Sequence, residues 1–229
     1  GYRFKAEDAC RREALCQQLL SQLGIELASH VIALGSVRAK VPAGLTVARL
    51  RARADATPLR CLDAAATKRM IREINGCMKR GDTLGGIFEV LIEGVPPGLG
   101  SYVHYDRRLD AILGRAILSI HAVKAVEVGD GVLAAGLPGS KVQDEIFYAR
   151  GRGFHRRSNR SGGFEGGMTT GEPLRVRGFL KPLSTLRKPL RSVDINTKRP
   201  VVATVERTDV TTVPAAGVIG EAMIAFEMG

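Results

Sequence analysis

The stretch PLRVRGFL, residues 173–180, alternates apolar side chains with arginines from Leu174 to Arg177. Side chains two positions apart in a β-strand point to the same side of the sheet. Leu174 and Val176 therefore predict a strand with one apolar face and one charged face. The stretch RPVVATVE, residues 199–206, has a similar β-branched pattern and predicts a further strand. Two alternating strands of this kind favour antiparallel sheets, in which one face is buried and the other is polar.

The rest of the chain supplies further strands and several helices. IELASHVIALG and IFEVLIEGVP mix β-branched and apolar residues, and each ends at a glycine or proline that terminates a strand. Apolar residues at helical spacing predict the helices, and Asp63 is a plausible N-cap of one of them. The predicted strands lie at about 25–35 and 87–95, with a further short strand through Val126 and Val128. The predicted helices lie at 6–23, 62–78, 107–120 and from Pro214 onward, and a basic connection lies at 36–62.

These elements intermix without a regular strand–helix alternation and without an internal repeat. A doubly wound parallel sheet requires that alternation, so its absence argues against such a fold. We therefore predict an α+β fold, with layered antiparallel sheets and helices outside.

The charge balance is unusual for a globular chain. Among 229 residues, 34 Lys and Arg face 23 Asp and Glu, which gives a net charge of +11. Hydrophobic residues make up 45% of the chain, enough for a substantial core, so disorder is not expected. A cationic excess of this size attracts phosphates of any kind. The four cysteines form no CxxC pair and have no histidine at metal-ligand spacing, so no metal site is predicted.

Targeting segments are also missing from the sequence pattern. No apolar run has the length needed to span a bilayer, and the first residues contain no apolar segment of the signal-peptide type. These observations predict a soluble cytoplasmic protein with no membrane partner.

Residues 156–185 combine glycines with cationic side chains around little that could fill a core. Glycines allow a backbone to approach a ligand closely, and the neighbouring cations favour an anionic one. Within this segment KPLST places Lys181 beside two hydroxyl groups, a combination that suits a phosphate ester. Further on, Arg207 and Asp209 stand two positions apart, so both side chains can point to one side of an extended backbone.

Several long motifs, in order, resemble one known family. The chain is similar to the C-terminal portion of chorismate synthase from about Leu23 onward, and a series of long motifs is far more specific than a single glycine pattern. The motifs are GDTLGG, PPGLGS, RLDAILGRAILSIHAVKAVEVGDG, RSNRSGGFEGGMTTGEPLRVRGFLKPLST and RTDVTTVPAAGVIGEAM.

The resemblance implies an enzyme that converts 5-enolpyruvylshikimate 3-phosphate to chorismate and phosphate by 1,4-elimination, a step of aromatic amino-acid biosynthesis by the shikimate pathway. It implies reduced FMN as cofactor without net redox change, NADPH as a candidate source of reducing equivalents, and a homotetramer. The glycines and cations of 156–185 would then face the flavin and a phosphorylated substrate. The family's N-terminal region, with a Gly-Glu-Ser-His-Gly motif and a second histidine, is not found in this sequence, so residues 1–229 are expected to form a partial domain.

The resemblance also assigns roles to particular residues. His121 stands where the family has an amide side chain, although its ring nitrogen can still donate a hydrogen bond. Asp209 is the candidate for handling a proton at the flavin, Arg207 for binding the flavin or a substrate anion, and Arg3 for binding the substrate phosphate. The expected flavin contacts are His121, Ala122, Gly166, Lys181, Pro182, Leu183, Ser184, Thr185 and Arg207.

Two other classes of function remain open from the residues alone. The net charge and the stretch RGRGFHRRSNR, residues 150–160, are compatible with a basic module that binds phosphate or nucleic acid. Aromatic residues, which stack on bases, make up only 5% of the chain, and no nucleic-acid-binding motif is present, so no nucleic-acid partner is predicted. The other alternative is an inactive, truncated homologue that binds FMN.

Overall fold

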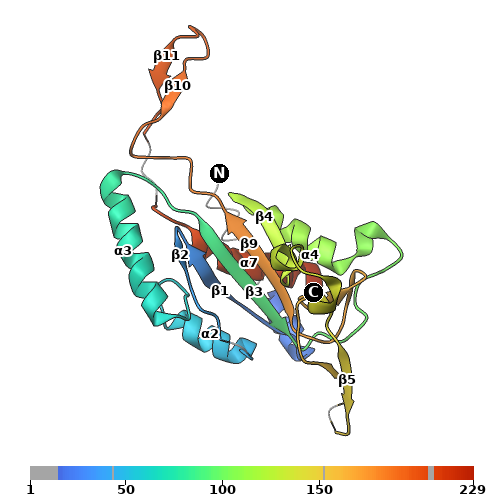
Figure 1. The fold of residues 1–229 in the computed structure, drawn as a ribbon. Helices are drawn as coiled ribbons and strands as arrows, with labels where there is room; N and C mark the ends of the chain where they lie inside the picture. Colours follow the sequence, from blue (N-terminus) through green and yellow to red (C-terminus); the bar gives the residue numbers. More distant parts are fainter. Residues whose placement is uncertain (1–14, 43, 152, 206–208) are drawn as a thin grey trace.

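A five-stranded antiparallel sheet forms the centre of the protein in the computed structural model, which describes residues 15–42, 44–151, 153–205 and 209–229 (Figure 1). The strand order is β2-β1-β3-β9-β4, and helices pack against both faces. The predicted α+β class is therefore confirmed. The strands of this sheet are β1 (Glu26–Leu34), β2 (Val37–Arg38), β3 (Gly86–Glu93), β4 (Val123–Val128) and β9 (Leu174–Leu180).

Strand β9 has the two faces that its alternation predicts. It lies between β3 and β4, and both neighbours run antiparallel to it. Leu174 and Val176 are fully buried on one face, while Arg175 and Arg177 project from the other. The apolar face of this strand forms part of the main core.

Two helices cover the apolar face of the sheet, α4 (Leu109–Leu118) and α7 (Val213–Met228). Phe88 of β3 is completely buried between this sheet and α7. A Cβ atom added to Gly178 of β9 would lie 2.4 Å from the Phe88 ring, and one added to Gly220 of α7 would lie 2.8 Å from it. The two glycines therefore make room for the ring, which lets α7 lie close to the strands.

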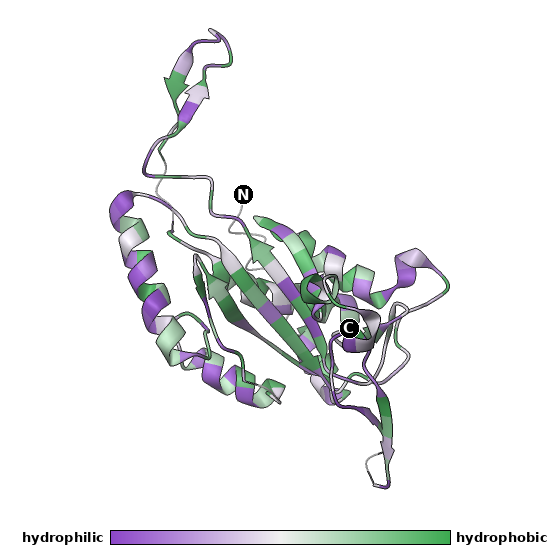
Figure 2. Ribbon diagram, in the orientation of Figure 1, coloured by the Kyte–Doolittle hydropathy of each residue, from purple (hydrophilic) through white to green (hydrophobic). Residues whose placement is uncertain are grey.

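The second face of the sheet is covered in part by α2 (Val47–Asp55), whose Leu50 packs with Ala28 and Leu91. The prediction of a simple connection over 36–62 is therefore wrong, because this segment contains both β2 and α2. Helix α3 (Ala64–Arg80) follows, and Figure 2 shows that it is hydrophilic over much of its length. Asp63 caps it as predicted, because its side chain accepts hydrogen bonds from two backbone N–H groups of the first turn.

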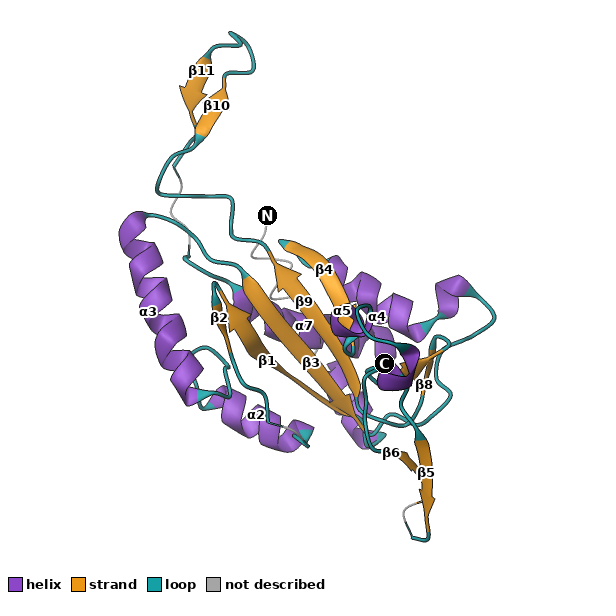
Figure 3. Cartoon of the chain, viewed as in Figure 1, coloured by secondary structure: helices purple, strands orange, loops and turns teal. Residues whose placement is uncertain are grey.

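Short hairpins and helical turns complete the chain (Figure 3). The strand predicted over 199–206 is wrong in extent, because β11 spans only Pro200–Val202 and pairs with β10 outside the central sheet. We call residues 186–205 the arm, because they extend away from the sheet in Figure 1. The remaining elements are η1 (Tyr105–Arg107), α5 (Gly131–Ala134), α6 (Gly139–Val142), β5 (Ile146–Ala149), β6 (Gly153–Arg156), β7 (Phe164–Glu165), β8 (Met168–Thr169) and β10 (Arg191–Val193).

The helix predicted over 6–23 is observed at 15–22, and its first part lies outside the described residues. None of the helices in the described ranges is both long and apolar enough to cross a membrane.

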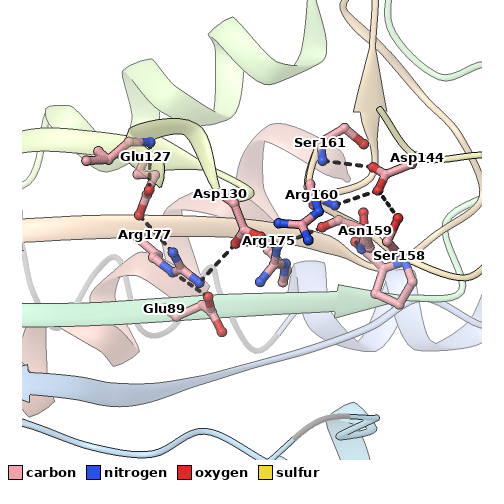
Figure 4. Close-up of polar contacts among 12 residues, drawn as sticks. Glu89, Glu127, Asp130, Asp144, Ser158, Asn159, Arg160, Ser161, Arg175 and Arg177 are labelled. Carbon is pink, nitrogen blue, oxygen red and sulfur yellow. Dashed lines mark hydrogen bonds and ion pairs between the residues drawn. The ribbon is translucent and has the colours of Figure 1, made fainter. Parts of the chain in front are cut away.

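A row of charged side chains crosses the second face of the sheet from β1 to β4, and Figure 4 shows its members Glu89, Arg177 and Glu127. His30 Nε2 lies 3.1 Å from Glu89 Oε1, Arg177 Nε lies 2.6 Å from Glu89 Oε2, and Arg177 Nη1 lies 2.8 Å from Glu127 Oε2. Burial alone would raise the pKa of Glu89, but the hydrogen bond from His30 and the positive charge of Arg177 outweigh it and lower the pKa to about 2.

This lowered pKa makes stability depend on pH. A carboxyl whose pKa falls on folding stabilises the folded state above its unfolded pKa, which is 4.5 here, and this contribution is lost as the pH falls towards 2. A difference of this size corresponds to about 3 kcal/mol. We expect the free energy of unfolding, measured by urea denaturation, to decrease between pH 5 and pH 2, and Glu89→Gln to remove part of that slope. An unchanged slope in the variant would contradict the assignment.

Candidate functional site

Segments that are far apart in sequence meet where β3 begins and β9 ends. The backbone N–H of Lys181, directly after β9, donates to the carbonyl oxygen of Ala122 at 2.9 Å. The hydroxyl group of Thr83 donates to the carbonyl oxygen of Leu183 at 2.7 Å. The N–H of Leu84 donates to the carbonyl oxygen of Val210, also at 2.7 Å. These bonds hold the KPLST segment beside the end of α4 on one side and the GDTLGG segment on the other, with Asp209 next to Val210.

Gly85 makes this convergence sterically feasible. A Cβ atom at this position would lie 2.3 Å from the carbonyl oxygen of Leu180 and 3.0 Å from the carbonyl carbon of Lys181. No side chain fits at that distance, so the backbone of GDTLGG can approach the KPLST segment only through a glycine. The glycine of this motif therefore has a packing role in positioning the site.

A cavity of about 210 Å³ lies at this junction and is lined by Asp209, Asp82, Thr83 and Arg187, among others. Asp209 is exposed to solvent, whereas Thr83 is buried. The backbone around Arg187 is fixed to the GDTLGG turn, because the N–H of Lys188 donates to the carbonyl oxygen of Gly81 at 2.9 Å. Two carboxylates that could exchange a proton and one guanidinium that could bind an anion thus face the same small cavity.

The cations near the junction are free to meet a ligand. Lys181, Arg187 and Lys188 are all exposed, and none of them forms an ion pair with another described residue. A cation without an ion pair can bind an anion without first breaking an interaction within the protein. The positive potential at this edge is therefore available to a phosphate or an anionic ring. The residues present therefore fit an anionic cofactor at this end of the sheet.

The predicted flavin contacts separate into two places. His121 directly follows the last turn after α4 and is exposed, and Ala122 adopts a left-handed backbone conformation with φ of 69°. Gly166 lies between β7 and β8, beside Gly167, whose carbonyl oxygen accepts a bond from the N–H of Leu109 at the start of α4. Helix α4 has ten residues, and at 1.5 Å per residue it separates Gly166 from His121 by about 15 Å.

His121, Ala122 and residues 181–185 are thus brought together with Asp209, and Gly166 is not. Arg3 and Arg207 lie outside the described residues.

The cations of the glycine-rich segment do not all face a ligand. Arg175 Nη2 lies 2.9 Å from Asp130 Oδ1, and Arg177 is paired with Glu89 and Glu127 on the sheet. The prediction that the cations of 156–185 together face the flavin and substrate is wrong for these two, because carboxylates on and beside the neighbouring strands already hold them. Strand alternation placed both arginines on one face, but their cross-strand partners depend on register, which the sequence does not display.

Three polar lining residues were not predicted: Asp82, Thr83 and Arg187. Two of them lie in GDTLGG, one of the motifs on which the resemblance rests, although no role was assigned to it. This motif was therefore the sequence signal that could have identified Asp82 and Thr83 as site residues. Among the ranges that the structure describes, no group of three or more His, Cys, Asp or Glu side chains could hold a metal ion.

The family model described as chorismate synthase matches residues 9–229. The chain belongs to the chorismate synthase family. "Chorismate synthase 1" of a Bacillus cereus strain is 51% identical over 215 residues, which cover 94% of this chain and 55% of the relative. "Chorismate synthase" of Geobacillus kaustophilus is 52% identical over the same shares. A crystal structure of chorismate synthase matches 97% of this chain and 62% of that chain, with a TM-score of 0.81 and 34% identity.

The chain therefore spans about half the length of the curated relatives that it matches. The predicted resemblance to the family is confirmed.

Proposed function

We propose that this chain supplies the flavin- and phosphate-binding part of a lyase that converts 5-enolpyruvylshikimate 3-phosphate to chorismate and phosphate. The observation that carries the proposal is the convergence of residues 181–185, His121, Ala122 and Asp209 at one edge of the sheet, in a member of this family. A dihydroflavin, its phosphate and an anionic substrate together require concentrated positive charge, and the unpaired cations at this edge supply it.

The residues have distinct proposed roles. Lys181, with the hydroxyl groups of Ser184 and Thr185, binds a phosphate group, and the backbone of Pro182 and Leu183 shapes the edge of the flavin site. Asp209 holds the proton that is exchanged near the flavin N5, and Arg207 binds an anionic group. Reduced FMN, when bound, supplies a dihydroflavin whose redox state is the same after the reaction as before it.

Other features of the whole enzyme follow from family membership and belong to the same proposal. We infer FMN as the flavin, NADPH as a source of its reducing equivalents, a homotetramer as the assembly and the cytoplasm as the compartment, because the enzyme is biosynthetic. In a homotetramer, Gly166 acts at a flavin site and Arg3 at the substrate phosphate, each together with residues from another copy or from the remainder of the enzyme.

Replacing Lys181 should weaken flavin binding by this chain. A cation that meets a phosphate or an anionic ring in a partly dehydrated site contributes about 1.5 to 3 kcal/mol. Lys181→Ala is therefore expected to lower the affinity for reduced FMN roughly 10- to 100-fold, and Arg207→Ala should have a similar effect. Anaerobic titration at fixed ionic strength, followed by flavin absorbance, measures both variants.

The matched control is Lys68→Ala. Lys68 is exposed on α3 and does not belong to the converging segments, so its removal changes the net charge without changing the site. Equal affinities in Lys181→Ala and Lys68→Ala would remove Lys181 from the flavin site and leave the proposal without its principal phosphate ligand.

A further inference from the structure

A second and larger hollow lies on the α2 face of the sheet. Its volume is about 520 Å³, and its lining includes His30 and Glu89 on the sheet, Leu45 and Leu50 on the α2 side, and the segment 156–160 opposite them. None of its lining residues belongs to the flavin candidates of the edge site. Cavities of this size commonly hold small metabolites.

Two arginines of this hollow have no acidic partner among the described residues. Arg156 and Arg175 also line it, but they pair with Glu165 and Asp130. Arg157 is exposed, with its guanidinium carbon 3.9 Å from the centre of the Phe147 ring, and Arg160 is half-buried; neither forms an ion pair in the described part of the chain. Their charges are therefore available to an anion.

The segment that carries these arginines is held in place by Asp144 (Figure 4). The Asp144 carboxylate accepts hydrogen bonds from the hydroxyl group of Ser158 at 2.6 Å, from the N–H of Arg160 at 2.9 Å and from the N–H of Ser161 at 2.9 Å. Burial raises the pKa of this carboxyl, but these bonds outweigh it and lower the pKa below its usual range. A loop fixed before binding loses less conformational entropy when a ligand arrives.

The same hollow has two buried polar atoms that lack a hydrogen-bond partner, His30 Nδ1 and Asn159 Oδ1. The His30 side chain is 1% exposed. Because the Glu89 carboxylate can only accept, His30 Nε2 carries the proton between them, and in that tautomer Nδ1 is the acceptor. The Asn159 amide nitrogen donates to the carbonyl oxygen of Pro173 at 2.7 Å, which fixes Oδ1 as the free end. Both free atoms therefore require a donor.

The two arginines without an acidic partner and the two buried acceptors without a hydrogen-bond partner together specify a kind of ligand. A simple anion would pair with the arginines but would leave the two acceptors without hydrogen bonds. Buried polar groups without hydrogen bonds destabilise a protein and are therefore rare. A ligand with an anionic group and hydroxyl groups satisfies both sets. The two acceptors are covered by neighbouring side chains, so the hydroxyl groups reach them after a side-chain rotation of the kind that commonly accompanies binding.

We propose that this hollow is a second ligand site, which binds a hydroxylated phosphate ester of small-metabolite size. Arg157 and Arg160 bind the phosphate group, and hydroxyl groups of the ligand donate to His30 Nδ1 and Asn159 Oδ1. The site is independent of the flavin edge, because the two share no lining residue.

Calorimetric titration of the 229-residue chain with three compounds tests the proposal. Ribose 5-phosphate carries both groups, sulfate carries only the charge at neutral pH, and ribose carries only the hydroxyl groups. We expect ribose 5-phosphate to bind about 10-fold more tightly than either of the others, because two charge-assisted bonds and two acceptor contacts act together. Equal affinities for ribose 5-phosphate and sulfate would overturn the hydroxyl part of the proposal.

Variants separate a specific site from general attraction to a basic protein. The double variant Arg157→Gln and Arg160→Gln should weaken ribose 5-phosphate binding about 100-fold, whereas Arg72→Gln, exposed on α3 and away from the lining, should leave it unchanged. Equal losses in both would show non-specific attraction and overturn the site.

The His30 contact has a direct readout in the ring nitrogen resonances of the chain. Ribose 5-phosphate should shift the His30 Nδ1 resonance, and sulfate should not. Tight binding that leaves this resonance unmoved would place the ligand away from His30 and overturn the proposed geometry.

Discussion

The 229-residue chain alone is expected to give no detectable conversion of 5-enolpyruvylshikimate 3-phosphate to chorismate, even with reduced FMN present. The elimination must remove a proton and expel phosphate, and general acid and base groups contribute about 100- to 10,000-fold each. By its resemblance to the family, the chain lacks the histidines assigned to proton transfer. Three of its own histidines do not replace them: His30 is buried on the α2 face, His104 precedes η1, and His155 lies in the hairpin of β5 and β6.

An anaerobic assay that follows the absorbance of chorismate measures this directly, with an intact relative as the positive control. Flavin binding by the same sample should persist, because His121, Ala122 and residues 181–185 lie within the chain. Turnover near that of the intact relative would contradict the expectation and would assign acid or base chemistry to residues of this chain, with His121 and Asp209 as the first to replace.

The second large effect concerns Arg177, which joins Glu89 and Glu127 across three strands. The side chain of Arg177 is 15% exposed and both carboxylates are 6% exposed. Arg177→Met would leave two buried carboxylates without the guanidinium that pairs with both, a change that typically costs about 3 to 5 kcal/mol. Denaturation in urea at pH 7 should therefore show a large loss of stability, enough to unfold a marginal domain.

Two further variants distinguish a buried charge effect from a general loss of an arginine. Arg115→Met removes a pair with Glu227 in which the arginine is 71% exposed, and it should cost less than about 1 kcal/mol. Adding Glu89→Gln and Glu127→Gln to Arg177→Met removes the uncompensated charges and should restore much of the stability. A loss of stability in Arg177→Met no larger than that in Arg115→Met would show that the row of charges contributes little.

Much of the fold could be predicted from the sequence because its strong local signals agree with its tertiary structure. The alternation in residues 173–180 produced β9 with the expected faces, and Asp63 capped α3 as expected. Helix α2 was missed, although Val47, Leu50 and Ala54 have helical spacing, because the arginines between them resemble a basic loop. The strand at 199–206 was overestimated because β-branched residues alone do not determine whether a segment finds a neighbour in the sheet.

The sequence was enough to predict which segments contribute to the candidate site, but not which of them lie close together in space. Proximity of Lys181, Ala122 and Thr83 depends on where β9 and α4 end, and these ends are set by packing of the whole sheet. Likewise, the distance between Gly166 and His121 follows from the length of α4, which the spacing of motifs along the chain does not express. Which arginines remain available to a ligand depends on strand register, as Arg177 shows.

The arm has a consequence for how this region can diverge between relatives. Its base is closed by the bond from the Ala203 N–H to the Leu190 carbonyl oxygen, and its strands pair one for one from Arg191 with Val202 to Val193 with Pro200. Deleting one residue from each strand shortens the arm and preserves the register at its base. An unmatched deletion shifts that register. Evolution can therefore vary the length of the arm freely only in matched steps, so its two strands must lengthen or shorten together.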